Sequence, residues 1–202
     1  MENKMFCFQC EQTAACTGCT GKAGVCGKTA DVAKLQDELT GALVGLARAA
    51  DNSPDANDNT WRLMIEGLFT AVTNVNFNEK TLGELIDEVH GEKTRLAPDC
   101  SICSSPCGRT GDYNMNNLWN AQEDIRSLKS LILFGIRGMA AYAHHAMVLG
   151  YTDDELNRFF KKALFVLGED WGMDELLPVV MEVGEKNLKC MELLDRANTE
   201  TY

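Results

Sequence analysis

Five of the nine cysteines in this 202-residue chain fall within residues 7–26, and this clustering restricts how the N-terminal segment folds. Residues 6–28 read FCFQCEQTAACTGCTGKAGVCGK, which is rich in glycine and small side chains and shows no helical stripe. Such a segment has too little apolar surface to become ordered alone. We therefore expect residues 1–28 to form a loop that wraps around a bound group.

The spacing Cys7-x2-Cys10-x8-Cys19-x6-Cys26 indicates a metal site. A C-x2-C pair lets one tight turn aim two thiolates at a single point, and the neighbouring glycines let the chain curl around a bulky group. Structural zinc sites usually join two short-spaced pairs of cysteines. Here six residues rather than two lie between Cys19 and Cys26, which favours an iron–sulfur cluster over zinc. Zinc stays open as an alternative, and Cys16 with Cys19 is an alternative ligand pair.

A second group of cysteines lies in the irregular stretch 94–118, at Cys100, Cys103 and Cys107. A plain loop of that length is unusual. The three thiols could hold a second metal with a fourth ligand from Cys190, His90 or solvent, could form a disulfide, or could have no metal. Cys190 itself is expected to be a buried small hydrophobe, and His144 and His145 to be ordinary helix residues rather than ligands.

Apolar residues at spacings of three and four predict six helices and no strand in the rest of the chain. The expected ranges are about 29–50, 60–75, 82–93, 121–149, 152–167 and 174–196. Capping boxes are expected at Thr81 with Glu84 and at Thr152 with Glu155, and Pro178 is expected in a first helical turn. The prediction is an all-α protein with two three-helix bundles, 29–93 and 119–202, joined by the loop 94–118.

The net charge of −11 argues against binding to nucleic acid or to an anionic membrane surface, because both ligands require clustered lysine and arginine. It favours a docking partner with a basic face, although solubility alone also explains it. No apolar run long enough for a membrane span and no signal region were found. We expect a cytoplasmic protein with reduced thiols.

Four segments resemble the hybrid-cluster proteins, also called prismane proteins or hydroxylamine reductases. They are MFCFQCEQTA (5–14), GVCGKTADVAKLQDELTGAL (24–43), GIRGMAAYAHHAMVLGY (135–151) and MELLDRANTETY (191–202). The segments follow the order of that family and span nearly the whole chain. The resemblance implies a helical first domain made of two three-helix bundles.

The resemblance also implies a ligand set, namely Cys7, Cys10, Cys19 and Cys26. The x8 spacing resembles members that carry a [4Fe-4S] cluster, whereas members with a longer insert carry [2Fe-2S], which is the alternative. Cys100, Cys103 and Cys107 are not part of the family pattern.

Members of this family are more than twice as long as this chain. Their later α/β domains hold the hybrid iron–sulfur–oxygen cluster that reduces hydroxylamine to ammonia or nitric oxide to nitrous oxide. We expect this chain, a fragment or a natural short form, to be an electron-entry domain that is inactive alone. Its expected partners are the remaining domains, a redox donor and, through exposed interdomain faces, a second copy. The alternatives are a zinc-pinned interaction module and a thiol redox switch.

Overall fold

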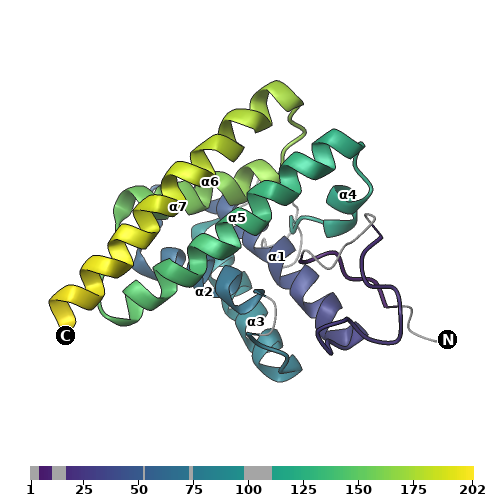
Figure 1. The fold of residues 1–202 in the computed structure, drawn as a ribbon, viewed down its shortest axis with the longest axis horizontal. Helices are drawn as coiled ribbons and strands as arrows, with labels where there is room; N and C mark the ends of the chain where they lie inside the picture. Colours follow the sequence, from purple (N-terminus) through teal and green to yellow (C-terminus); the bar gives the residue numbers. More distant parts are fainter. Residues whose placement is uncertain (1–4, 11–16, 52, 73–74, 98–110) are drawn as a thin grey trace.

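The computed structural model describes residues 5–10, 17–51, 53–72, 75–97 and 111–202. These residues form seven helices and no strand, which confirms the all-α prediction (Figure 1). The helices are α1 (Ala30–Asp51), α2 (Asp58–Thr70), α3 (Glu79–Leu96), α4 (Met115–Trp119), α5 (Glu123–Val148), α6 (Asp154–Gly168) and α7 (Met173–Thr201). Six of them correspond to the expected helices, and α4 is a short helix inside the stretch predicted to be a loop.

Helix α1 lies at the centre and contacts α2, α3, α4 and α6. All of its residues from 39 to 47 are buried, so this part of the helix is enclosed on every side. Two glycines allow this packing. A Cβ atom at Gly41 would collide with the carbonyl oxygen of Tyr113, and one at Gly45 would lie 3.0 Å from Oδ1 of Asp112. The segment before α4 therefore lies directly on α1.

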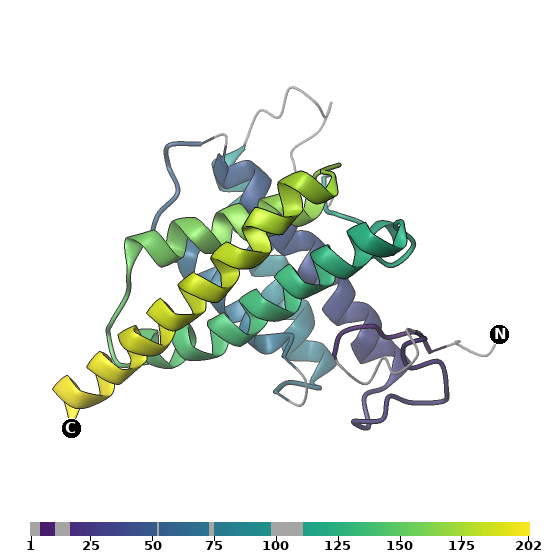
Figure 2. The same cartoon turned by 45° about the horizontal axis from the view of Figure 1, so that its top comes forward.

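Helices α5 and α7 lie side by side and run in the same direction, with α6 returning between their ends (Figure 2). At one end, the Tyr151 hydroxyl donates to Glu200 at 2.8 Å. At the other end, Nζ of Lys129 donates to the carbonyl oxygens of Leu167 at 3.1 Å and Glu169 at 2.6 Å. These contacts connect both ends of α5 to the chain that follows it.

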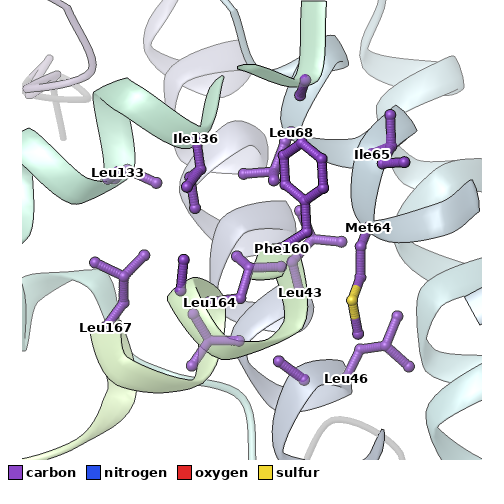
Figure 3. Close-up of a cluster of buried hydrophobic side chains, with 14 of the residues drawn as sticks. Leu43, Leu46, Met64, Ile65, Leu68, Leu133, Ile136, Phe160, Leu164 and Leu167 are labelled. Atoms are coloured by element: carbon purple, nitrogen blue, oxygen red, sulfur yellow. The ribbon is translucent and has the colours of Figure 1, made fainter. Parts of the chain in front are cut away.

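One hydrophobic core joins the two halves of the chain (Figure 3). Leucines of α1 and α2 meet apolar side chains of α5 and α6 in a cluster that includes Leu43, Leu46, Met64, Leu68, Leu133, Ile136, Phe160, Leu164 and Leu167. Burial of this apolar surface is the main favourable contribution to folding. The division into the units 29–93 and 119–202 stays a prediction, because a shared core does not define a boundary.

Both expected capping boxes were placed wrongly. Asn78 caps α3 by accepting from the backbone N–H groups of Lys80 and Thr81, and Asp153 caps α6 by accepting from Leu156. Asparagine and aspartate are at least as good as threonine as helix caps. Helix α3 therefore begins before Thr81, and α6 begins after the position that a cap at Thr152 predicts. Pro178 was also misplaced: α7 begins at Met173, which puts the proline beyond the first turn.

Helix α5 is long and apolar enough, by length and composition alone, to cross a membrane, which the sequence analysis did not anticipate. Core helices pass the same test, and here the helix packs against α2, α6 and α7. Its buried face includes Ile132, Ile136, Met139 and Ala143. The apolar residues of α5 therefore form part of the hydrophobic core.

Candidate metal centre

The described parts of the cysteine segment, residues 5–10 and 17–29, lie beside the start of α1 (Figures 1 and 2). Met5 and Cys7 form a small buried cluster with Ala33 of α1, and Cys19 packs against it. The segment is therefore anchored by apolar contacts at the first turn of the central helix. This position places the predicted ligands next to buried residues of the fold.

Cys7 and Cys19 are paired through their backbones. The Cys7 N–H donates to the Cys19 carbonyl at 3.0 Å, and the Cys19 N–H donates to the Cys7 carbonyl at 2.8 Å. Residues directly opposite one another in such an antiparallel pair project their side chains to the same side. Gly18 makes the pairing feasible, because its φ is +68° and a Cβ atom there would lie 2.8 Å from the Cys7 oxygen.

A glycine turn carries Cys26. The Gly27 N–H donates to Gly24 at 2.9 Å, and the Gly24 N–H donates to Lys28 at 2.8 Å. Gly27 has φ of +86°, a left-handed conformation that favours glycine. A Cβ atom at Gly24 would lie 3.3 Å from Sγ of Cys26. The glycines therefore leave space next to this sulfur.

The environment of Cys7 combines burial with a nearby cation. The residue is 7% exposed, and burial raises the pKa of its thiol. Nζ of Lys28 lies 3.8 Å from Sγ of Cys7 and, together with the backbone N–H of Gln9, opposes that shift. Hydrogen bonds and positive charge next to a sulfur are features that tune metal-bound thiolates.

A buried polar network joins the cysteine segment to α1 and α5. Arg137 donates to the Gln9 carbonyl at 3.2 Å and to Oγ1 of Thr40 at 2.9 Å. The Gln9 amide donates to the Asp37 carboxylate and, at 3.4 Å, to the Ala33 carbonyl. Burial raises the pKa of Asp37 to about 6 and lowers the pKa of Arg137 to about 10.

Sequence analysis missed this network. Its polar members come from three separate parts of the chain, so no local spacing connects them. The available signal was Arg137 itself, a charged residue inside the apolar run of α5. A fully buried arginine requires partners, and their absence from the neighbouring sequence indicates a long-range contact.

The structure brings together only part of the predicted ligand set. Within the described ranges, no three Cys, His, Asp or Glu side chains are grouped closely enough to hold a metal ion. Cys7 and Cys19 are adjacent through their backbone pairing, Cys10 and Cys26 lie on the same segment, and all four are free thiols. The assignment of all four as ligands stays a prediction.

The other candidates have different outcomes. Cys16, Cys100, Cys103 and Cys107 lie outside the described residues. Cys190 is fully buried in α7, as expected, and burial raises its pKa to about 12. His144 stacks on Phe69 with ring centroids 4.3 Å apart.

His90, named above as a candidate fourth ligand, instead pairs with Asp112 at 2.8 Å. The same carboxylate also accepts from Lys93, a lysine that is 1% exposed. The pair lies at a groove of about 620 Å³ that also borders Asp37 and Phe6. Residues of α1, α3 and the start of α4 complete the lining of this groove.

Comparisons with known proteins agree with the resemblance. A model of the Prismane/CO dehydrogenase family matches residues 5–202. The chain is 42% identical to a hydroxylamine reductase of Maridesulfovibrio salexigens and 37% identical to one of Methanococcus vannielii, over 98% of this chain and 40% of each relative. A hydroxylamine reductase of Chlorobaculum tepidum is 42% identical over 98% of this chain and 39% of its own length. The chain thus spans about 40% of the length of these curated relatives, and it belongs to the Prismane/CO dehydrogenase family.

Proposed function

We propose that this chain binds an iron–sulfur cluster through Cys7, Cys10, Cys19 and Cys26 and serves as the electron-transfer part of a hydroxylamine reductase. The observation that carries the proposal is the backbone pairing of Cys7 with Cys19 directly beside the buried Lys28. The names of the relatives support the enzyme class. The proposed cluster is [4Fe-4S], with [2Fe-2S] as the alternative.

The chemistry of the residues fits such a group. Thiolates are the usual ligands of iron–sulfur clusters. Gly18 and Gly27 allow the tight turns of the segment, and Gly24 leaves space next to Sγ of Cys26. A bound cluster would accept and release single electrons. The protein would contribute the Gln9 N–H and the Lys28 ammonium next to Cys7, and burial would limit water access to that sulfur.

We propose that the chain alone does not turn over hydroxylamine. The match covers only about 40% of the length of the hydroxylamine reductases, and the residues that such an enzyme uses for turnover would lie outside the matched part. Electrons would come from a redox donor with a basic face, which the net charge of −11 would attract. The reduced thiols suit the cytoplasm, and the same negative charge disfavours nucleic acid and anionic membranes as partners.

The surface of α7 supports a further partner. Its exposed apolar residues lie within roughly a quarter of the helix circumference. They are Met173, Leu177, Met181, Leu188 and Met191, each between 44% and 67% exposed. An apolar stripe of this kind marks an interaction surface. We propose that it packs against the remaining domains of a longer protein and that, in the 202-residue chain, it drives self-association.

The test is anaerobic purification followed by iron, sulfide and zinc analysis, an absorption spectrum and a hydroxylamine assay. Equal amounts of iron and sulfide without turnover would support the proposal, and the iron count would separate [4Fe-4S] from [2Fe-2S]. Zinc without iron would point to the interaction module, and reversible disulfides without metal would point to the thiol switch. Hydroxylamine turnover would contradict the proposed absence of an active site.

A further inference from the structure

Two buried cations lie close to the proposed cysteine ligands. Lys28 is 2% exposed, with its Nζ 3.8 Å from Sγ of Cys7 and 6.0 Å from the centroid of the Phe77 ring. Arg137 is 4% exposed and donates to Gln9 and Thr40. Its Nε is buried and, among the described residues, has no hydrogen-bond partner.

The proposed ligands lie close to both cations. Asp37, Cys7 and Cys10 act electrostatically on Arg137, and Asp37 also interacts with Lys28. A buried charge is costly unless it is paired, and proteins rarely retain one without a role. A cluster on the cysteines would bring negative charge next to Lys28, whose Nζ lies 3.8 Å from Sγ of Cys7.

We propose that Lys28 and Arg137 balance the negative charge of an iron–sulfur cluster on Cys7, Cys10, Cys19 and Cys26 and thereby make its reduction easier. The inference rests on the proposed function. The cluster gains one electron from a low-potential one-electron donor, and no bond is formed or broken. A thiolate-ligated cluster becomes more negative on reduction, so a nearby enclosed cation stabilises the reduced state more than the oxidised state.

The experiment is a dithionite titration of the cluster-loaded chain under argon, followed by absorption and electron paramagnetic resonance. Lys28→Met removes the enclosed charge, and Lys28→Arg keeps it. Lys22→Met is the matched control, because it removes an equal charge from an exposed position of the same segment. We expect Lys28→Met to lower the equilibrium constant for reduction about tenfold, which is 59 mV for one electron. Lys28→Arg should stay near the wild-type value, and Lys22→Met should shift the potential much less, because solvent screens its charge.

A second measurement separates charge balance from structural support. Thermal unfolding of the metal-free chain should occur at the same or a higher temperature in Lys28→Met, because the substitution removes the desolvation cost of a buried ammonium group. Equal potentials for Lys28→Met and Lys22→Met would overturn the inference. So would a lower melting temperature of metal-free Lys28→Met, which would identify a structural lysine. A wild-type chain without iron would overturn the proposed function first, and metal analysis would reveal that failure before any titration.

Discussion

Gly135 of α5 packs directly against Val183 of α7, so that a Cβ atom at position 135 would collide with Cγ1 of the valine. The contact lies along the extensively packed pair of α5 and α7. A glycine inside a helix either weakens the helix or lets a neighbouring helix approach closely. Gly135 allows close approach, whereas a Cβ atom at Gly138 would meet nothing within 4 Å.

The two glycines of α5 form a matched pair for a stability test. We expect Gly135→Ala to lower the free energy of unfolding by ~1–3 kcal/mol, because the added methyl group overpacks the contact with α7. Gly138→Ala should instead raise it by ~0.5–1 kcal/mol, because alanine loses less entropy in a helix. Urea unfolding followed by circular dichroism measures both. Gly135→Ala combined with Val183→Ala should recover part of the loss, and equal effects of the two single variants would contradict the packing argument.

If Cys7 and Cys19 are cluster ligands, cysteine variants should differ sharply in their iron content. Cys7→Ser and Cys19→Ser each remove one thiol of the backbone-paired residues and should abolish most iron binding after anaerobic reconstitution. Cys190→Ala removes a fully buried thiol on α7 and should leave the iron content unchanged. This substitution should lower the free energy of unfolding only slightly, through a small loss of packing. Loss of iron in Cys190→Ala, or full retention in Cys7→Ser, would contradict the assignment.

Helix positions were predictable from sequence because the apolar spacing of a core helix is a local property. The stripes of α1, α2, α5 and α6 located those elements to within a few residues. Helix α4 was missed because five residues are too few to show a period, although Asn114 now serves as its cap. The Arg137–Gln9 contact spans 128 residues and leaves no local pattern. Partner choice between distant polar residues depends on the tertiary fold, which periodicity does not encode.

The buried carboxylate of Glu92 should make the free energy of unfolding sensitive to acid. Glu92 is 6% exposed and accepts from Arg95, Thr60 and Asn59, and these hydrogen bonds, led by that of Arg95, lower its pKa to about 2. Because the folded pKa is depressed, the stabilisation is complete above about pH 5 and is lost as the pH falls toward 2. The difference in unfolding free energy between wild type and Glu92→Gln should therefore be largest near neutral pH and shrink in acid.

Glu155 offers a control for that pH test. Its pKa is also lowered to about 2, by hydrogen bonds from Lys186 and Lys189, but the residue is exposed. Solvent and salt screen exposed ion pairs, so Glu155→Gln should have a small effect that fades at ~1 M salt. The Glu92→Gln effect should persist at that salt concentration. A Glu92→Gln effect that is independent of pH from 2 to 7 would rule out the ionised carboxylate as its source.

The apolar stripe of α7 predicts how the 202-residue chain behaves in solution. The double variant Leu177→Lys with Met181→Lys places two charges in the centre of the stripe, where both side chains are more than half exposed and make little contribution to the core. We expect the wild-type chain to show a mass that rises with concentration in analytical ultracentrifugation and the double variant to remain monomeric. Glu84→Lys, on the exposed face of α3, changes the net charge by the same amount and should associate like wild type. A monomeric wild-type chain at high concentration would contradict self-association through this stripe, and continued association of the double variant would place the interface elsewhere.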